Sequence, residues 1–203
     1  MSNLLFWDVD TQNDFMRPGG KLYVPGAEKI IENVRRLNTA AAGAGMLVIS
    51  SVDAHQPTDP ELQNYPPHCL AGTEGQKKVT GTLLDRAYVI PNRKVALPDL
   101  DSYSQIVIEK QDVNVFTNPN IEDLLRRVAR DKEIMLYGVV TEICVDQAAR
   151  GLIQRGYRVN LVSDAVRQLD EKLAATTVSE VVHSGGKLLG TEEVVSALRS
   201  HPV

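Results

Sequence analysis

The chain has 203 residues, 43% of them hydrophobic and 24% charged, a composition that is typical of a soluble globular protein. A net charge of −4 without any block of Lys and Arg argues against a nucleic-acid partner, and no apolar stretch is long enough to span a bilayer. Two widely separated cysteines exclude a disulfide framework and fit a reducing compartment, and the first residues show no signal-peptide pattern, so we expect a cytoplasmic protein.

Five nearly continuous apolar runs predict buried strands, because strands covered on both faces lack the usual alternation. Helical patterns separate these runs, which predicts right-handed crossovers and a three-layer α/β/α fold with a mostly parallel sheet of five or six strands. We expect residues 1–203 to form a single domain of this kind. The runs are Leu4 to Val9, Met46 to Ser51, Gln105 to Glu109, Ile134 to Val139 and Val159 to Ser163, with a possible sixth at Lys187 to Gly190.

The predicted helices have recognisable boundaries. Asn118 is the expected N-cap of the second helix, with Pro119 in its first turn. Gly156 is expected to end the third helix at its C-terminus. The remaining helices are expected to begin after Gly26, near Asp170 and at Thr191.

The loop that follows the second strand gathers residues that bind divalent metals. Asp53 and His55 come directly after the strand, and Glu61 and His68 follow in the same loop. Carboxylate and imidazole groups are common ligands of such metals, and open α/β sheets bind ligands beyond the ends of their strands. A solvated polar loop is the alternative for Asp53 and His55 alone. The stiff context Tyr65-Pro66-Pro67-His68 favours a metal site instead.

Cys144 lies just after a buried strand, at the start of the third helix, and is the candidate nucleophile. A helix N-terminus lowers the pKa of a thiol and directs backbone N–H groups at a developing oxyanion. A free cysteine is often simply a small buried hydrophobic residue, and Cys144 taken alone favours that alternative.

Two further strand ends carry groups that suit a thiol nucleophile. Asp10 follows the first strand and could accept the thiol proton, although Asp8 and Asp14 compete for this role and an Asx-turn is the alternative. Lys110 follows the third strand, where its ammonium would hold a thiol and a carboxylate as anions. The alternatives are a solvated Lys110 and a role for Lys94, which lies in a loop.

This arrangement resembles the cysteine hydrolases of the isochorismatase-like superfamily, and within it most closely the nicotinamidases. An acid, a lysine and a cysteine at strand ends are shared across the superfamily. The Asp-x-His and Pro-Pro-His-Cys motifs of the loop after the second strand have a narrower distribution within it and point to the nicotinamidases. The matching pieces follow the order of the family over most of the chain: Asp10 to Phe15, Asp53 to His55, Tyr65 to Cys69, Lys110, and Gly138 to Cys144.

The resemblance implies a role for each matching residue. Cys144 would attack the amide carbonyl of nicotinamide, Asp10 would move the thiol proton to the departing ammonia, and Lys110 would stabilise the thiolate and orient Asp10. The backbone N–H groups of Val140 and Cys144 would hold the oxyanion, and a cis peptide bond would fall between Val139 and Val140. Water would then hydrolyse the thioester to nicotinic acid, a reaction of NAD salvage.

The resemblance also implies one divalent metal ion, to which the pyridine nitrogen of the substrate coordinates. Zinc is expected first, with iron or manganese as alternatives. Phe15 and Tyr65 would flank the ring, and the protein is expected to form a homo-oligomer. The implied ligands are Asp53, His55 and His68, together with Glu61, which stands where another histidine is frequent in the family.

The sequence departs from the family pattern near the first strand. Thr11 replaces the more usual apolar residue, and Asp8 places a charge inside a strand that is normally apolar, so it needs a buried partner. Tyr65 stands where Trp is frequent and still permits ring stacking. Cys69, next to His68, is interpreted as packing rather than as a fourth ligand.

Two other functions stay open from the sequence. A related amidohydrolase of the superfamily could act on another small amide or carbamoyl compound. A non-catalytic binding protein with a structural zinc is the alternative from another class, although such sites are usually closed by Cys and His ligands. The requirement for metal separates the first alternative from a nicotinamidase.

Overall fold

The computed structural model describes residues 3–199. Within them, seven parallel strands form one sheet in the order β3-β4-β2-β1-β5-β6-β7. The predicted sheet is therefore confirmed, with seven strands in place of five or six. The strands are β1 (Leu4–Val9), β2 (Val48–Asp53), β3 (Ala87–Ile90), β4 (Gln105–Lys110), β5 (Glu133–Val139), β6 (Arg158–Arg167) and β7 (Leu188–Leu189).

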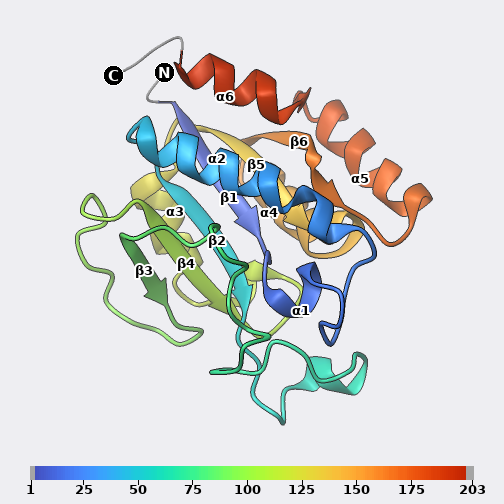
Figure 1. Cartoon of the computed structure of the whole chain (residues 1–203). Helices are drawn as coiled ribbons and strands as arrows, with labels where there is room; N and C mark the ends of the chain where they lie inside the picture. Colours follow the sequence, from blue (N-terminus) through green and yellow to red (C-terminus); the bar gives the residue numbers. More distant parts are fainter. Residues whose placement is uncertain (1–2, 200–203) are drawn as a thin grey trace.

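Helices cover both faces of the sheet and give the three expected layers (Figure 1). Helices α2 and α6 pack with α1 on one face, and α3, α4 and α5 contribute to the cluster on the other. The helices are α1 (Asn13–Met16), α2 (Ile31–Gly43), α3 (Ile121–Val128), α4 (Asp146–Gln154), α5 (Glu171–His183) and α6 (Thr191–Arg199), and the short helical turns are η1 (Ala27–Ile30), η2 (Pro60–Gln63), η3 (Val115–Thr117) and the π-helical η4 (Thr141–Val145).

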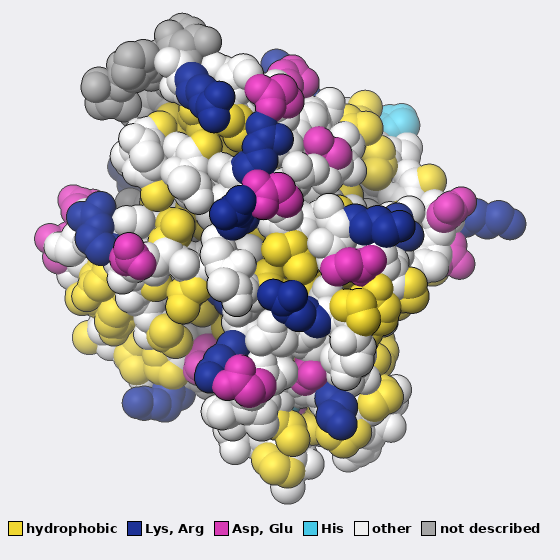
Figure 2. Space-filling model, in the orientation of Figure 1, with side chains coloured by type: hydrophobic (Ala, Val, Ile, Leu, Met, Phe, Trp, Pro, Cys, Tyr) yellow, Lys and Arg dark blue, Asp and Glu magenta, His cyan; other side chains and the backbone are white. Residues whose placement is uncertain are grey.

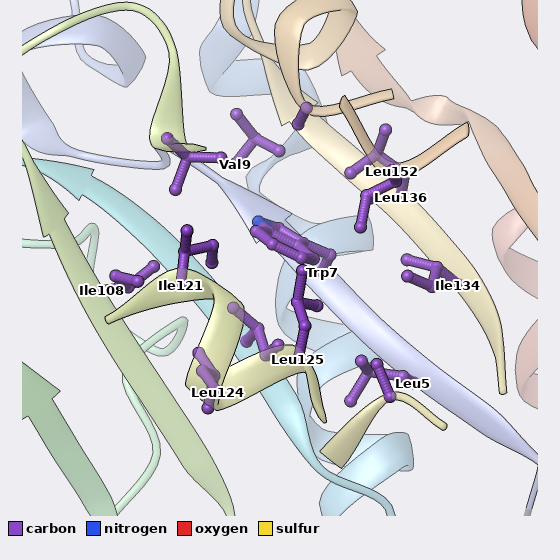
Figure 3. Close-up of a cluster of buried hydrophobic side chains, with 14 of the residues drawn as sticks. Leu5, Trp7, Val9, Ile108, Ile121, Leu124, Leu125, Ile134, Leu136 and Leu152 are labelled. Carbon is purple, nitrogen blue, oxygen red and sulfur yellow. The ribbon is translucent and has the colours of Figure 1, made fainter. Parts of the chain in front are cut away.

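The central strand β1 contributes to both hydrophobic clusters. Leu5, Trp7 and Val9 are fully buried under α3 and α4, and Figure 3 shows Trp7 between Leu125 and Leu136. Phe6 lies in the opposite cluster, as the alternation of a strand requires. Burial of both faces explains why these strands are almost continuously apolar in sequence.

The parallel sheet brings the carboxyl ends of its strands to one edge. In Figure 1, β1 leads into α1 at this edge, and the loop after β2 extends beyond it. The register pairs Asp53 of β2 with Lys110 of β4, and Val9 of β1 with Gly138 of β5. Residues that are far apart in sequence therefore meet at one end of the sheet.

Several predicted boundaries were wrong. Strand β2 begins at Val48 and includes Asp53, because the chain before it is still completing the turn from α2. Asn120 precedes α3, whereas the expected cap Asn118 accepts a hydrogen bond from the backbone of Asn120 and so shapes the turn before the helix. Gly156 follows the end of α4 with φ of +82°, as expected for a glycine after a helix.

The surface carries charges of both signs. Figure 2 shows Lys and Arg interspersed with Asp and Glu over the face covered by α2, without a large region of one sign. No helix within residues 3–199 is long and apolar enough to cross a membrane.

Candidate active site and metal centre

Lys110 is at the centre of a buried ionic cluster at the carboxyl edge of the sheet. Its ammonium donates to Oδ1 of Asp53 and lies 2.9 Å from Oδ2 of Asp10 and 3.8 Å from Sγ of Cys144. Lys110, Asp10 and Asp53 are each 1% exposed. The three strand ends that the sequence singled out are therefore in contact, and the predicted Asp10, Lys110 and Cys144 lie together.

Burial and the charges of neighbouring groups act in opposite directions on the pKa values of this cluster. Burial raises the pKa of the Asp10 carboxyl, which Lys110 only partly offsets, and it raises the pKa of the Cys144 thiol well above its usual value. Burial alone would lower the pKa of Lys110, but the carboxylates of Asp10 and Asp53 outweigh it and raise that pKa. Lys110 therefore offsets the desolvation of the acid and of the thiol only in part, because burial is the largest influence on both pKa values.

The backbone of Asp10 is in the left-handed region, with φ of 50°. A regular strand would place residues two apart, such as Asp8 and Asp10, on the same face. The turn at Asp10 instead directs its carboxylate to Lys110, and neither of its oxygens has a partner with regular hydrogen-bond geometry within the described residues. Such a conformation costs energy in a residue other than glycine, so the surrounding structure must hold Asp10 in place.

Cys144 is held by the segment between β5 and α4. The peptide bond between Val139 and Val140 is cis, as the resemblance implied, and Cys144 lies in the π-helical turn η4. Gly138 precedes this segment with φ of +121°, and a Cβ there would lie 2.1 Å from the carbonyl oxygen of Val9. Only glycine permits this approach of β5 to the exit of β1.

The four predicted metal ligands lie together. The ligand atoms of Asp53, His55, Glu61 and His68 are all within 4.8 Å of one another. Oδ2 of Asp53 is 3.5 Å from Nε2 of His68 and 3.8 Å from Nε2 of His55, and Oε1 of Glu61 is 3.8 Å from Nε2 of His55. Nε2 of His55 and Oε2 of Glu61 are buried without a hydrogen-bond partner in the described residues. A donor set of two imidazoles and two carboxylates with such orphaned atoms fits a divalent cation.

Asp53 belongs to both clusters. Its Oδ1 accepts from Lys110 and its Oδ2 faces the histidines. The backbone of Asp53 is fixed by Gln12, whose side chain accepts from its N–H at 2.7 Å and donates to its carbonyl at 2.8 Å. Gln12 lies within the matching piece Asp10 to Phe15, but no role could be assigned to it from the sequence, because an amide that acts on another segment's backbone has no local signature.

Asp14 does not compete with Asp10. Its carboxylate accepts from the backbone N–H groups of Cys69 at 2.7 Å and Lys21 at 3.0 Å. It therefore joins α1 to the metal loop. Cys69 is fully buried, its sulfur lies 3.8 Å from the carbonyl of Gly75, and it is outside the ligand group, which agrees with a packing role.

A small pocket opens beside these groups. Phe15, Tyr65 and His68 form one part of its lining, and Val140 and Cys144 form another. The rings of Phe15 and His68 are 5.3 Å apart, and those of Tyr65 and His68 are 6.4 Å apart. The residues predicted to flank a flat ring thus border the same space as the thiol. The sequence did not indicate the remaining apolar lining, Leu22, Val113 and Ile143.

Asp8 has the buried partner that the sequence requires. Lys78 donates to its Oδ2 at 2.8 Å, Asn38 donates to the same oxygen at 2.8 Å, and Thr11 donates to Oδ1 at 2.8 Å. Lys78 also donates to the hydroxyl of Thr11 at 2.7 Å. The two departures from the family pattern, Asp8 and Thr11, therefore belong to one network, which is separate from the Lys110 cluster.

Lys94 is excluded from the site by its position. Its ammonium donates to the carbonyl of Pro119 at 3.1 Å on an exposed part of the surface. The strand-end Lys110 is therefore the lysine that contacts Cys144 and Asp10.

A family model described as the isochorismatase domain matches residues 4–95 and 91–193. The chain belongs to the isochorismatase family. A nicotinamidase of Escherichia coli (strain K12) is 29% identical to it over 178 residues, which cover 78% of this chain and 80% of that relative. An N-carbamoylsarcosine amidase of an Arthrobacter species is 24% identical over 195 residues, which cover 96% of this chain and 70% of that relative. This isochorismatase-family protein is thus similar to amidohydrolases and is itself a hydrolase.

A solved structure agrees with this assignment. The pyrazinamidase of Pyrococcus horikoshii in complex with zinc is 25% identical, with a TM-score of 0.74, covering 93% of this chain and 99% of that one. The isochorismatase-like fold is therefore shared along nearly the whole length of both proteins.

Proposed function

We propose that this protein is a metal-dependent nicotinamidase, a cysteine amidohydrolase that converts nicotinamide to nicotinic acid and ammonia. The observation that carries the proposal is that Asp53 connects the Lys110 cluster to the group of metal ligands. Asp53 accepts from Lys110, which faces Asp10 and Cys144, and it also faces His55 and His68. A thiol and a group of metal ligands thus border one aromatic-lined pocket.

The first half of the reaction acylates Cys144. Asp10 accepts the thiol proton while the sulfur attacks the amide carbonyl carbon, and the carbonyl π electrons move to oxygen. The tetrahedral intermediate collapses, the C–N bond breaks, and Asp10 returns the proton to the departing ammonia. The raised pKa of Asp10 suits this role, because a carboxyl must hold the proton between the two transfers.

The second half releases the acid. Asp10 accepts a proton from water as the water oxygen attacks the thioester carbonyl. The C–S bond then breaks, and the sulfur leaves with the proton as a thiol beside Lys110. In both halves the backbone N–H groups of Val140 and Cys144 would stabilise the oxyanion. The buried ammonium of Lys110 would stabilise the thiolate that forms transiently.

The last residue of β2 and the loop that follows it would hold the metal ion. Asp53, His55, Glu61 and His68 offer two oxygen and two nitrogen donors, and two of these residues carry buried atoms that lack a hydrogen-bond partner among residues 3–199. When bound, a divalent cation at this position supplies a Lewis-acid contact for the ring nitrogen of a pyridine amide. Zinc is our first candidate, with iron or manganese as alternatives.

The lining of the pocket favours a flat, uncharged substrate. Phe15 and Tyr65 provide aromatic walls, and Val140 and Ile143 provide aliphatic ones. None of the lining residues is Lys or Arg, and Lys110 is already shared by two carboxylates. A substrate with its own carboxylate, as in a carbamoylated amino acid, would find no Lys or Arg side chain to pair with in this lining. A carbamoyl compound remains the second candidate because of the similarity to an N-carbamoylsarcosine amidase.

The test is ammonia release from nicotinamide by protein of measured metal content. We expect turnover that disappears after chelation, returns with added Zn²⁺, and is absent in Cys144→Ala. Cys69→Ala is the matched control, since it removes the other buried thiol outside the ligand group. Failure of the metal-loaded parent to release ammonia would overturn the assignment and move the search to carbamoyl substrates.

A further inference from the structure

Asp59 touches the metal cluster without belonging to the four ligands. Its Oδ2 lies 3.2 Å from Nδ1 of His55 and accepts the backbone N–H of Gln56 at 2.8 Å. The second bond fixes the position of the carboxylate, so the approach to His55 does not depend on a freely rotating side chain. The side chain of Asp59 is only 13% exposed.

The contact determines which nitrogen of His55 faces the cluster. A carboxylate beside Nδ1 favours the tautomer with the proton on that nitrogen, which leaves the lone pair on Nε2. Nε2 is the nitrogen that lies 3.8 Å from both Asp53 and Glu61, and it is buried without a hydrogen-bond partner in the described residues. It is therefore oriented as a ligand atom.

Asp59 also positions a second ligand through its backbone. Its N–H donates to the carbonyl of Gln56 at 3.0 Å, and its own carbonyl accepts from Leu62 at 3.1 Å. These bonds form the turn that leads into η2, the short helix that carries Glu61. One residue thus fixes the direction of His55 and the start of the helix that presents Glu61.

The other histidine is held differently. Nδ1 of His68 lies 2.8 Å from the backbone carbonyl of Pro66, a neutral acceptor in its own loop. The partner of His55 is a carboxylate, whereas the contact of His68 with its carbonyl is the shorter of the two. The two imidazoles are therefore held by chemically different partners, and only that of His55 is a side chain that substitution can remove.

We propose that Asp59 is a positioning residue of the metal centre, which orients His55 and strengthens it as a ligand. The inference rests on the metal site of the proposed function. Removal of such an outer carboxylate typically weakens metal binding by about 10-fold to 100-fold. The ligands themselves remain in place, so the loss should come from binding rather than from folding.

The experiment measures Zn²⁺ affinity by competition with a chromogenic chelator, on metal-free protein, beside the thermal unfolding of the same samples. We expect affinity to fall by about 100-fold in Asp59→Ala and by about 10-fold in Asp59→Asn, which keeps an acceptor oxygen. The melting temperature of the metal-free variants should stay near that of the parent. Asp85→Asn, at an exposed position, is the matched control and should bind as the parent does.

Each contrary result has a distinct meaning. Parent-like Zn²⁺ affinity in either Asp59 variant would overturn the inference, and so would an equal loss in Asp85→Asn. If Asp59→Ala does not fold, the Zn²⁺ affinity of Asp59→Asn alone tests the inference. Zinc binding is measured without substrate, so a parent that binds Zn²⁺ and releases no ammonia from nicotinamide would refute the proposed function and leave the role of Asp59 intact.

Discussion

Two buried carboxylates that are two residues apart in the chain have opposite surroundings. Asp8 receives hydrogen bonds from Thr11, Asn38 and Lys78, each at 2.8 Å. Asp10 shares one ammonium with Asp53 and has no partner of regular hydrogen-bond geometry among the described residues. The carboxylate of Asp8 is fully hydrogen-bonded, whereas the carboxylate of Asp10 lacks such partners within residues 3–199 and lies beside Lys110 near the Cys144 thiol. The ion pair of Asp8 with Lys78 therefore has a structural role, whereas the pair of Asp10 with Lys110 lies where it can take part in catalysis.

The largest effect is expected for Lys110→Met. The substitution leaves Asp10 and Asp53 without their shared cation and removes the charge beside Cys144. We expect nicotinamide turnover to fall by about 10³-fold or more, as for the loss of a member of a catalytic group. The rate of ammonia release measures this, with Lys94→Met as the surface control. Comparable turnover in the two variants would contradict the central position of Lys110.

Lys78→Met should act on stability instead. It leaves Asp8 buried without its cation, so the free energy of unfolding should fall by about 3–5 kcal/mol. Turnover per folded molecule should stay within a few-fold of the parent, because the ammonium of Lys78 donates to Asp8 and Thr11, which are outside the Lys110 cluster. Denaturant unfolding measures the first effect. The double variant Asp8→Asn with Lys78→Met should recover part of the loss, and a failure to recover would mean that the pair does not act as a unit.

Gln12→Ala is expected to have a smaller effect that reaches both clusters. It leaves the backbone N–H and carbonyl of Asp53 without their side-chain partner, at a cost of about 1–3 kcal/mol. Asp53 should then be held less well toward Lys110 and toward the histidines. We expect weaker Zn²⁺ binding together with slower turnover, measured on the same preparation. Loss of one property alone would show that Gln12 serves a single cluster.

The pH dependence of kcat/KM tests the protonation of Asp10. Burial raises the pKa of Asp10 above 3.8, and the carboxyl must be unprotonated in the free enzyme to accept the thiol proton. Activity should therefore decline toward acid pH through a limb whose midpoint lies above 3.8, and it should fall about tenfold per unit below that midpoint. Rates of ammonia release in buffers of constant ionic strength give the profile. A flat profile down to pH 3.8 would remove Asp10 from the proton transfer.

The sequence was informative where a residue's role follows from its place on a strand. Apolar runs predicted the central strands, and parallel strands place their ends together, so Asp10, Lys110 and Cys144 could be expected at one edge. The edge strand β3 was missed because it has only four residues, too short an apolar run for a clear strand signal, and Ile90 alone among them is buried.

The sequence was uninformative where a contact joins distant segments. Lys78 reaches Asp8 across 70 residues, and nothing near either residue records the pairing. Asp59 is close to His55 in sequence, but its role depends on which nitrogen it faces, and spacing does not determine that. The rise in the pKa of the Cys144 thiol could not be foreseen, because the depth of burial, which sets the desolvation, is a property of the folded chain.

The strand register that pairs Asp53 of β2 with Lys110 of β4 links the recovery of activity to correct folding of the sheet. Side chains on a strand alternate between the two faces of a sheet, so a shift of β4 by one residue against β2 would turn Lys110 to the opposite layer. The same shift would bury apolar residues of β4 on the wrong side. A correctly aligned sheet and a complete ionic cluster therefore arise together, and the recovery of hydrolysis during refolding would report the alignment of these two strands.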